Sequence, residues 1–271
     1  MIGLVNGKMA DLSKVHHIVI GYDEIEEYKI NINILRNVFV KGEDLLITAI
    51  YNGNNYNEIE EKYKSEEVNN FIVLEENKGY VWGAIDAIQK GLTFVDTLTD
   101  RRDIVLLTNF DGLFFSEERY NKLVDDFIKS GKPFGVGFSH EVKHLFSDLM
   151  LFRKEFVSIF CEGMDKVKAE LVDWECEKHV WSTLNVIGDV DKMWWCFERD
   201  NDEQQGRNYI FHKEYGFGHC HGKDNIEDKM NEHDTLDLYL LNNKIFTGTG
   251  QLDLFATHRG SRVPLTAVGY I

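Results

Sequence analysis

Residues 103–112 read DIVLLTNFDG, a short apolar run that ends in polar residues and glycine. The run over 103–108 has the length and composition of a buried strand. Asp111 follows it closely, and a carboxylate in that position can hold Mg²⁺ or Mn²⁺, which take oxygen ligands and often bridge substrate phosphates. The alternative is that Asp111 only forms an Asx turn into the next loop.

Similar apolar runs precede this strand, and segments with helical periodicity separate them. The runs predict strands at 15–20, 45–51 and 71–74, and the periodic segments predict helices at 28–39 and 80–89. Strands that alternate with helices are typical of a parallel sheet with crossover helices. We therefore expect an α/β fold with a mostly parallel, Rossmann-like central sheet flanked by helices.

The second half begins with the most clearly delimited helix of the chain. Ser116 is a suitable N-cap, Glu117 and Glu118 suit the positive end of the helix dipole, and Gly131 and Pro133 end the helix. Because no linker interrupts the sequence, we expect a single domain over the whole chain. The segments predicted after this helix are strands at 134–138 and 148–152, a helix around 174–184 and an aromatic stretch at 193–197.

Composition excludes several classes of protein. The 271 residues include 46 acidic and 30 basic side chains, which give a formal net charge of -16 at pH 7. A nucleic-acid-binding surface needs the opposite sign, and no run of about 18 apolar residues predicts a transmembrane segment. The four cysteines form no closely spaced pair, and the first residues lack the apolar core of a secretory signal. We therefore expect a cytoplasmic protein.

Ligands in open α/β sheets bind in the crevice outside the carboxyl ends of the strands. The sequence therefore predicts the ligand site among the residues that directly follow the first four strands, which are almost all polar or glycine. These residues are 21–23, 51–55, 75–79 and 109–112.

The order of these segments resembles the GT-A fold glycosyltransferases, within them the family-2-like group that transfers sugars from nucleotide donors. The resemblance covers about residues 15–185. It rests on four turns in register, which are the polar turn after 18–20, the loop at 51–55 in place of an Asp-Asp-Gly-Ser type loop, the Asn77-Lys78-Gly79 turn, and Asn109-Phe110-Asp111 in place of an Asp-x-Asp motif.

This resemblance implies a metal-dependent glycosyltransferase, as in polysaccharide biosynthesis. It would move a sugar from a nucleotide-diphosphate donor, with a UDP-sugar favoured, to a hydroxyl of a glycan, glycolipid or glycoprotein, with inversion. Residues 14–112 would bind the donor and 113–235 the acceptor, and 236–271 would be a C-terminal extension. The implied donor-binding residues are Gly21, Tyr22, Asn52, Asn77, Lys78, Gly79 and Asn109.

The resemblance also implies a metal site, in which Asp111 holds Mn²⁺ or Mg²⁺ against the leaving diphosphate. Asn109 stands where the family has a first aspartate. Many enzymes of this fold complete the site with a histidine from the C-terminal region, for which His219 and His221 are the candidates. Residues two apart in an extended segment point the same way. A loop with surface histidines is the alternative.

The acceptor hydroxyl needs a general base. In the family this base is an aspartate that opens a helix after an acceptor-side strand, and residues 172–175 resemble that helix start. Asp173 is the expected base and Glu175 the second candidate, while a helix-capping role is the alternative for Asp173. Arg153 would neutralise a phosphate or form a salt bridge.

Four of the five tryptophans have two possible roles. Trp194 and Trp195 would form a stacking platform for an acceptor sugar, or at least one of them would pack in the core. Trp82 and Trp181 lie on predicted helices, and we expect both in the core.

Two other functions stay open on sequence alone. A sugar-phosphate nucleotidyltransferase uses a related sheet, but it should carry a glycine- and Lys/Arg-rich loop where this chain has the acidic segment 21–24. A non-catalytic nucleotide- or carbohydrate-binding protein would explain why Asn109 and Tyr51-Asn52 replace the carboxylates of the family.

Overall fold

The structure is a computed structural model of the whole chain. The residues that it describes are 12–22, 25–39, 42–53, 67–76, 78–99, 102–114, 116–139, 144–168, 176–188, 190–198, 209–220, 255–258 and 261–264.

A seven-stranded sheet forms the centre of the molecule, with strand order β3-β2-β1-β4-β7-β6-β8. The strands β3, β2, β1 and β4 are parallel to one another, β7 is antiparallel to both β4 and β6, and β8 is parallel to β6. The predicted mostly parallel sheet is therefore confirmed. The strands are β1 (Val15–Gly21), β2 (Leu46–Tyr51), β3 (Asn70–Val73), β4 (Ile104–Asn109), β6 (Phe134–Ser139), β7 (His144–Arg153) and β8 (Trp194–Glu198).

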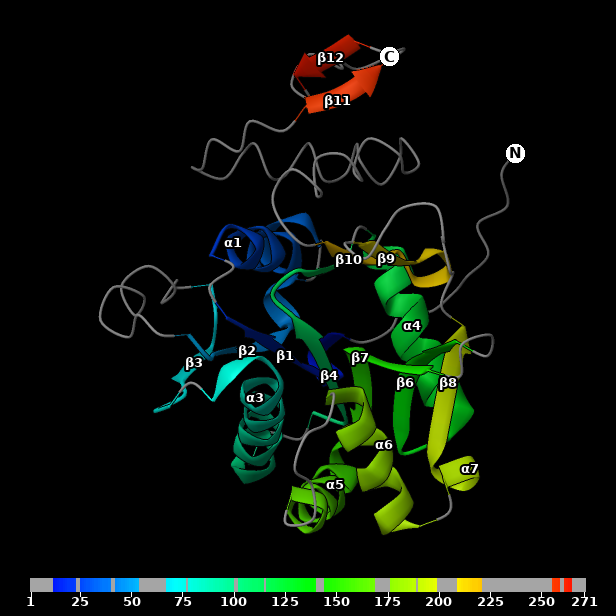
Figure 1. The fold of residues 1–271 in the computed structure, drawn as a ribbon. Helices are drawn as coiled ribbons and strands as arrows, with labels where there is room; N and C mark the ends of the chain where they lie inside the picture. Colours follow the sequence, from blue (N-terminus) through cyan, green and yellow to red (C-terminus); the bar gives the residue numbers. More distant parts are fainter. Residues whose placement is uncertain are drawn as a thin grey trace.

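Helices cover both faces of this sheet (Figure 1). One face packs against α1 (Ile25–Asn33), its π-helical continuation η2 (Ile34–Val38), and α4 (Glu117–Ser130). The other face packs against α3 (Gly79–Thr97), α5 (Lys154–Lys168) and α6 (Cys176–Ile187). The predicted arrangement of a sheet flanked by helices is confirmed.

The caps of α4 form as the sequence predicts. The Ser116 hydroxyl accepts a hydrogen bond from the main-chain N–H of Arg119 at 3.3 Å. Gly131 follows the last turn with φ of 64°, the left-handed conformation that glycine adopts without strain.

Two helices differ from the expectations. The helix α5 was not predicted, although its buried residues Phe156, Phe160 and Met164 recur at helical spacing. The helix α3 continues to Thr97, well beyond the predicted end at 89, because Leu92 and Val95 extend the buried stripe.

A second, three-stranded sheet lies above α4 and beside α1 (Figure 1). Its order is β5-β10-β9 and its strands are antiparallel. The strands are β5 (Gly112–Phe114), β9 (Tyr209–His212) and β10 (Phe217–Cys220), and η5 (Lys213–Tyr215) connects the last two. The other described elements are η1 (Leu12–Lys14), η3 (Gly42–Asp44), α7 (Val190–Met193), and the paired strands β11 (Phe255–His258) and β12 (Ser261–Pro264).

Neighbouring tryptophans of β8 face opposite sides of the sheet, which argues against a joint stacking platform. Trp195 packs with the core on the α1 and α4 side, and Trp194 packs with the core on the α3, α5 and α6 side. Trp82 packs against the same core as Trp194, as expected. The prediction for Trp181 was wrong, because its side chain is 39% exposed and meets the Trp194 ring at 5.3 Å.

Candidate functional site

The carboxyl ends of the first four strands in the chain meet at one edge of the sheet. Gly21 at the end of β1 pairs with Tyr51 at the end of β2, and Tyr51 pairs with Val73 at the end of β3. On the other side of β1, Ile20 pairs with Asn109 at the end of β4. The residues that follow these strands therefore start from the same edge, where the sequence predicts the ligand site.

A buried asparagine of α1 fixes the turn at residues 109–112. The side-chain nitrogen of Asn31 donates hydrogen bonds to the main-chain carbonyls of Asn109, Phe110 and Gly112, at 3.2, 3.0 and 2.8 Å. Asn31 is only 1% exposed, so these bonds form away from water. Two N–H groups serve three acceptors, which holds the three carbonyls of the turn toward one point.

The turn is also fixed by the packing of Phe110. Its ring lies 4.6 Å from the ring of Tyr28, measured between centroids, and a Cβ atom at Gly21 would lie 2.1 Å from it. Gly21 is therefore required by the close approach of the Phe110 ring. The contact of Gly21 with a donor nucleotide stays a prediction.

Asp111 lies in this turn, 4% exposed, directly before β5. The first residue of β5, Gly112, pairs with His219 of β10. The main chain of His219 is thus brought beside the turn that carries Asp111, although the two residues are far apart in sequence. The side chain of His219 and the whole of His221 lie outside the described residues. Within the described part of the chain, no group of three His, Cys, Asp or Glu residues could hold a metal ion.

Chemically, the donor set suits a hard divalent cation. A buried carboxylate in a turn of fixed shape would supply one oxygen ligand, and an imidazole from β10 would supply a second ligand. The register of β5 and β10 is the observation that makes this pair possible.

Asn52 follows β2 and is 6% exposed. It lies against the second turn of α3, where a Cβ atom at Gly83 would lie 1.9 Å from its Nδ2. No described residue donates a hydrogen bond to its Oδ1. A buried acceptor without a donor is costly, and the N–H of a bound ligand would satisfy it.

Lys78 and Gly79 begin α3. Gly79 has φ of 81° and open space where a Cβ would lie. The Lys78 ammonium is 2.6 Å from Asp86, whose other carboxylate oxygen bonds to Lys168 at the end of α5. Partial burial would raise the pKa of Asp86, but the hydrogen bonds from Lys168 and Lys78 outweigh this effect and lower the pKa. The hydrogen bond to Asp86 likewise raises the pKa of Lys78. Asn77 lies outside the described residues.

The start of α6 contacts β7 close to the same edge. The Ser147 hydroxyl donates to Glu177 in the first turn of α6 at 2.8 Å. Asp148 is 4% exposed, and the next residue, Leu149, pairs with Thr108 near the end of β4. Asp148 is thus a buried carboxylate beside the predicted site that the sequence analysis used only as the start of a strand.

The structure describes Arg153 but neither of the two candidate bases. Asp173 and Glu175 directly precede α6 in sequence and lie outside the described residues. Arg153 pairs with Ile104 at the opposite end of β4, so it lies away from the site. Its guanidinium donates to the main-chain carbonyl of Ile128 at 2.8 Å and lies over the Phe127 ring. The phosphate role predicted for Arg153 was wrong, because these contacts hold it to the end of α4, and it forms no ion pair with an acid among the described residues.

A buried histidine lies directly beneath the site. The Nε2 of His17 forms a hydrogen bond of 2.9 Å with the Thr108 hydroxyl, one residue before Asn109. Burial, with the positive charges of His16 and Arg36 in support, lowers the pKa of His17 from 6.5 to about 3. His17 is therefore neutral at physiological pH.

Sequence reasoning missed Asn31, although the signal was present. Asn31 is a polar residue between Ile30 and Ile32 in the apolar part of the first helix. A polar side chain buried in such a place needs a partner, and main-chain carbonyls of a turn are frequent partners. The sequence did not indicate which turn would supply these carbonyls.

Comparisons with known proteins do not identify the ligand. No protein-family model matches the sequence, and no curated protein matches it. A mannosyltransferase from Pyrobaculum calidifontis, solved in complex with GDP-Man and Mn²⁺, aligns with a TM-score of 0.46 and 13% identity over 68% of this chain and 55% of that chain. This chain therefore spans little more than half of that enzyme.

A second solved structure is the 4-diphosphocytidyl-2C-methyl-D-erythritol synthase from Anaerococcus prevotii. It aligns with a TM-score of 0.47 and 10% identity over 72% of this chain and 91% of that chain. At identities and TM-scores this low, neither likeness says what this chain binds. In the part of the chain that is described, no helix is both long and apolar enough to cross a membrane.

Proposed function

We propose that this chain is a glycosyltransferase that moves a sugar from a nucleotide-diphosphate donor to a hydroxyl acceptor, with a bound Mn²⁺ or Mg²⁺. The observation that supports the proposal is the pairing of Gly112 with His219, which brings the main chain of a second candidate metal ligand beside the turn of Asp111. That turn lies at the end of β4, where ligands of α/β sheets bind.

The roles of the residues follow from the chemistry of the transfer. The bond between the anomeric carbon and the diphosphate breaks, a bond to the acceptor oxygen forms, and the hydroxyl proton passes to a carboxylate. Asp111, with His219 or His221, would hold the cation, which supplies charge stabilisation for the leaving diphosphate. Asp173, or else Glu175, would accept the proton, and the transfer would invert the anomeric centre.

The contact between Ser147 and Glu177 supports this choice of base. It holds the first turn of α6 against β7 beside Asp148, close to the end of β4. The start of α6 therefore lies in the neighbourhood of the predicted metal turn.

The donor nucleotide would lie over the ends of β1, β2 and β3. Asn52 carries this part of the proposal, because its buried Oδ1 needs a donor that a nucleobase N–H would provide. Gly21, Tyr22 and Asn109 would line the same edge. Lys78, in the turn with Asn77 and Gly79, would meet the diphosphate.

A thermal-shift screen tests the proposal with the whole chain. Nucleotide sugars with different bases, UDP-sugars first, are added with and without Mn²⁺, because a ligand that binds only the native state raises the melting temperature. We expect a shift for one nucleotide that needs the metal, and no such shift in Asp111→Ala. An Asp111→Ala variant that turns over donor and resists chelators would contradict the metal site.

Assays of turnover, run with the nucleotide that gives a shift, distinguish the two other functions. A sugar-phosphate nucleotidyltransferase would release pyrophosphate from a nucleoside triphosphate and a sugar phosphate. A non-catalytic binding protein, which Asn109 in place of an aspartate would favour, would show a shift without turnover over a broad set of acceptors.

A further inference from the structure

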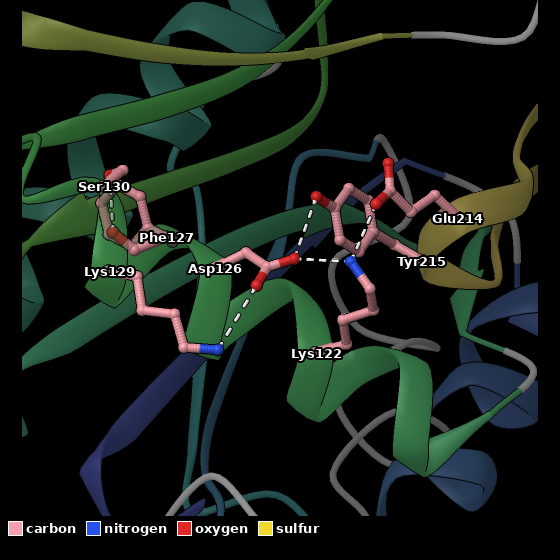
Figure 2. A network of polar contacts seen from close by, with 7 residues as sticks. All are labelled: Lys122, Asp126, Phe127, Lys129, Ser130, Glu214 and Tyr215. Carbon is pink, nitrogen blue, oxygen red and sulfur yellow. Dashed lines mark hydrogen bonds and ion pairs between the residues drawn. The ribbon is translucent and has the colours of Figure 1, made fainter.

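A polar network joins α4 to the connection between β9 and β10 (Figure 2). The Lys122 ammonium is 2.6 Å from Asp126 on its own helix and 2.8 Å from Glu214 in η5. It also lies over the Tyr215 ring, 4.8 Å from the centroid. The Tyr215 hydroxyl donates to the same oxygen of Asp126 at 3.5 Å. The Asp126 carboxylate of α4 therefore contacts both the Lys122 ammonium, which also reaches Glu214 of η5, and the Tyr215 hydroxyl of η5.

Tyr215 extends this contact into the core. Its side chain is 4% exposed, and its ring meets those of Phe197 and Trp195 at 5.5 and 6.1 Å. Glu214, by contrast, is 60% exposed, so the network lies at the rim of the buried contact. Against the opposing effect of partial burial, the hydrogen bonds to Asp126 and Glu214 raise the pKa of Lys122, which is therefore charged at physiological pH.

The main chain leads directly from this contact to the candidate metal turn. Gly216 follows with φ of 57° and lies against the Arg119 side chain, where a Cβ would be 2.9 Å from Arg119 Cδ. Phe217 then begins β10 and packs against Gly112, and His219 pairs with Gly112. Only Gly216 to Gly218 separate Tyr215 from His219.

We infer that Lys122, Asp126 and Tyr215, named here the α4 anchor, position β10 so that His219 meets the turn of Asp111. This inference rests on the proposed function, in which His219 is a metal ligand. The anchor residues touch neither metal nor substrate, so they are positioning residues. Groups that orient a metal ligand change metal affinity by about 10- to 100-fold when they are removed.

Opposite changes of charge separate positioning from electrostatics. Asp126→Ala removes a negative charge, which by itself would weaken binding of a cation, and Lys122→Ala removes a positive charge, which by itself would strengthen it. If the anchor positions β10, both variants weaken Mn²⁺ binding, by about tenfold for Asp126→Ala. Titration of the metal-free chain with Mn²⁺, followed by electron paramagnetic resonance or calorimetry, measures this directly.

Lys129→Ala is the matched control. Lys129 lies on the same helix, and its replacement by alanine removes the same charge as Lys122→Ala. Its ammonium is 3.6 Å from Asp126, and in Figure 2 it lies on the other side of Asp126 from Glu214 and Tyr215. We expect parental Mn²⁺ affinity in Lys129→Ala and recovery of that affinity in Lys122→Arg. Hydrogen exchange provides a readout without metal, since the amides of β10 should exchange faster in Asp126→Ala and Lys122→Ala, and at the parental rate in Lys129→Ala.

Each outcome decides between the claims. Shifts of opposite sign in Lys122→Ala and Asp126→Ala, or parental affinity in both, would overturn the positioning role while Asp111→Ala still abolished Mn²⁺ binding. If the parent chain binds no Mn²⁺, the metal site of the proposed function fails and the positioning role fails with it.

Discussion

The turn after β4 and the turn before α3 start from the same edge of the sheet, but they are held in different ways. The first is fixed from inside the protein, by three hydrogen bonds from buried Asn31 and by the Phe110 ring against Gly21. The second is held at the surface, by the ion pair of Lys78, whose side chain is 48% exposed, with Asp86.

This difference fits the two tasks of the proposed function. A metal turn must keep its geometry through the reaction, and burial provides that rigidity because internal groups have one packed arrangement. A turn that admits and releases a charged donor must give up contacts easily, and exposed ion pairs contribute little free energy. The two turns therefore predict different responses to the same kind of mutation.

The largest expected effect comes from adding one methyl group at Gly21, which packs against the first turn, and it is compared with the same change at Gly79 in the second turn. Gly21→Ala should lower the free energy of unfolding by about 3 kcal/mol, because the new Cβ would overlap the Phe110 ring, which is itself confined by Tyr28. Gly79→Ala should lower it by only about 1 kcal/mol, since it adds the strain of a positive φ in open space. Urea unfolding followed by circular dichroism measures both. Equal losses in the two variants would contradict the comparison.

A smaller effect is expected from removing the clamp on the metal turn. Asn31→Ala should lower the free energy of unfolding by about 2 kcal/mol, since buried carbonyls lose their donor. Asn31→Asp should be at least as destabilising, because a carboxylate cannot donate to those carbonyls. Both variants should also lose Mn²⁺ affinity, measured by calorimetry below the melting temperature. Parental affinity in a folded Asn31→Ala variant would show that the clamp does not shape the metal site.

Acid should lower the stability of the fold through His17, which lies beneath the buried turn after β4. The pKa of His17 is about 3 in the folded chain, against its ordinary value of 6.5, which we take for the unfolded chain. The unfolded chain therefore binds a proton first as pH falls. The free energy of unfolding should therefore fall between pH 6.5 and 3, by up to about 1.4 kcal/mol per pH unit from this residue. His179, whose pKa burial and then Lys168 lower to about 4, should add to the loss.

The variant His17→Gln isolates the contribution of His17. Glutamine has no titrating group and can still reach the Thr108 hydroxyl, so the pH dependence of unfolding should be shallower than in the parent chain. Unfolding in urea at several pH values between 7 and 4 measures the two slopes. Identical slopes would mean that His17 is not held neutral in the folded protein.

The sequence predicted the sheet better than it predicted the site. Apolar runs such as 104–108 are local signals, and the burial of β4 on both faces confirms them. The contacts that shape the turn at 109–112 join α1 to β4 and β10 to β5. Such contacts depend on which segments meet in three dimensions. No local pattern in the glycine-rich segment around His219 indicated that this residue would pair with Gly112.

The aromatic residues teach the same lesson. Trp194 and Trp195 are neighbours in sequence, which suggested a joint surface, but alternation along β8 separates them by the thickness of the sheet. Trp181 lies at an apolar position of a helical pattern, yet its side chain is 39% exposed, and its ring meets that of Trp194 at 5.3 Å.

The smallest effect on stability should come from the surface turn, where function responds more than folding. Asp86→Asn weakens the ion pairs of Lys78 and Lys168 and should change the free energy of unfolding by less than about 1 kcal/mol. If Lys78 meets the donor diphosphate, it must leave Asp86 first, so Asp86→Asn should lower the donor KM and Lys78→Ala should raise it. Asp165→Asn is the matched control, since it removes the same charge beside Gln89. A higher donor KM in Asp86→Asn would mean that the carboxylate holds Lys78 in place for the donor, and the surface turn would then be as preorganised as the buried one.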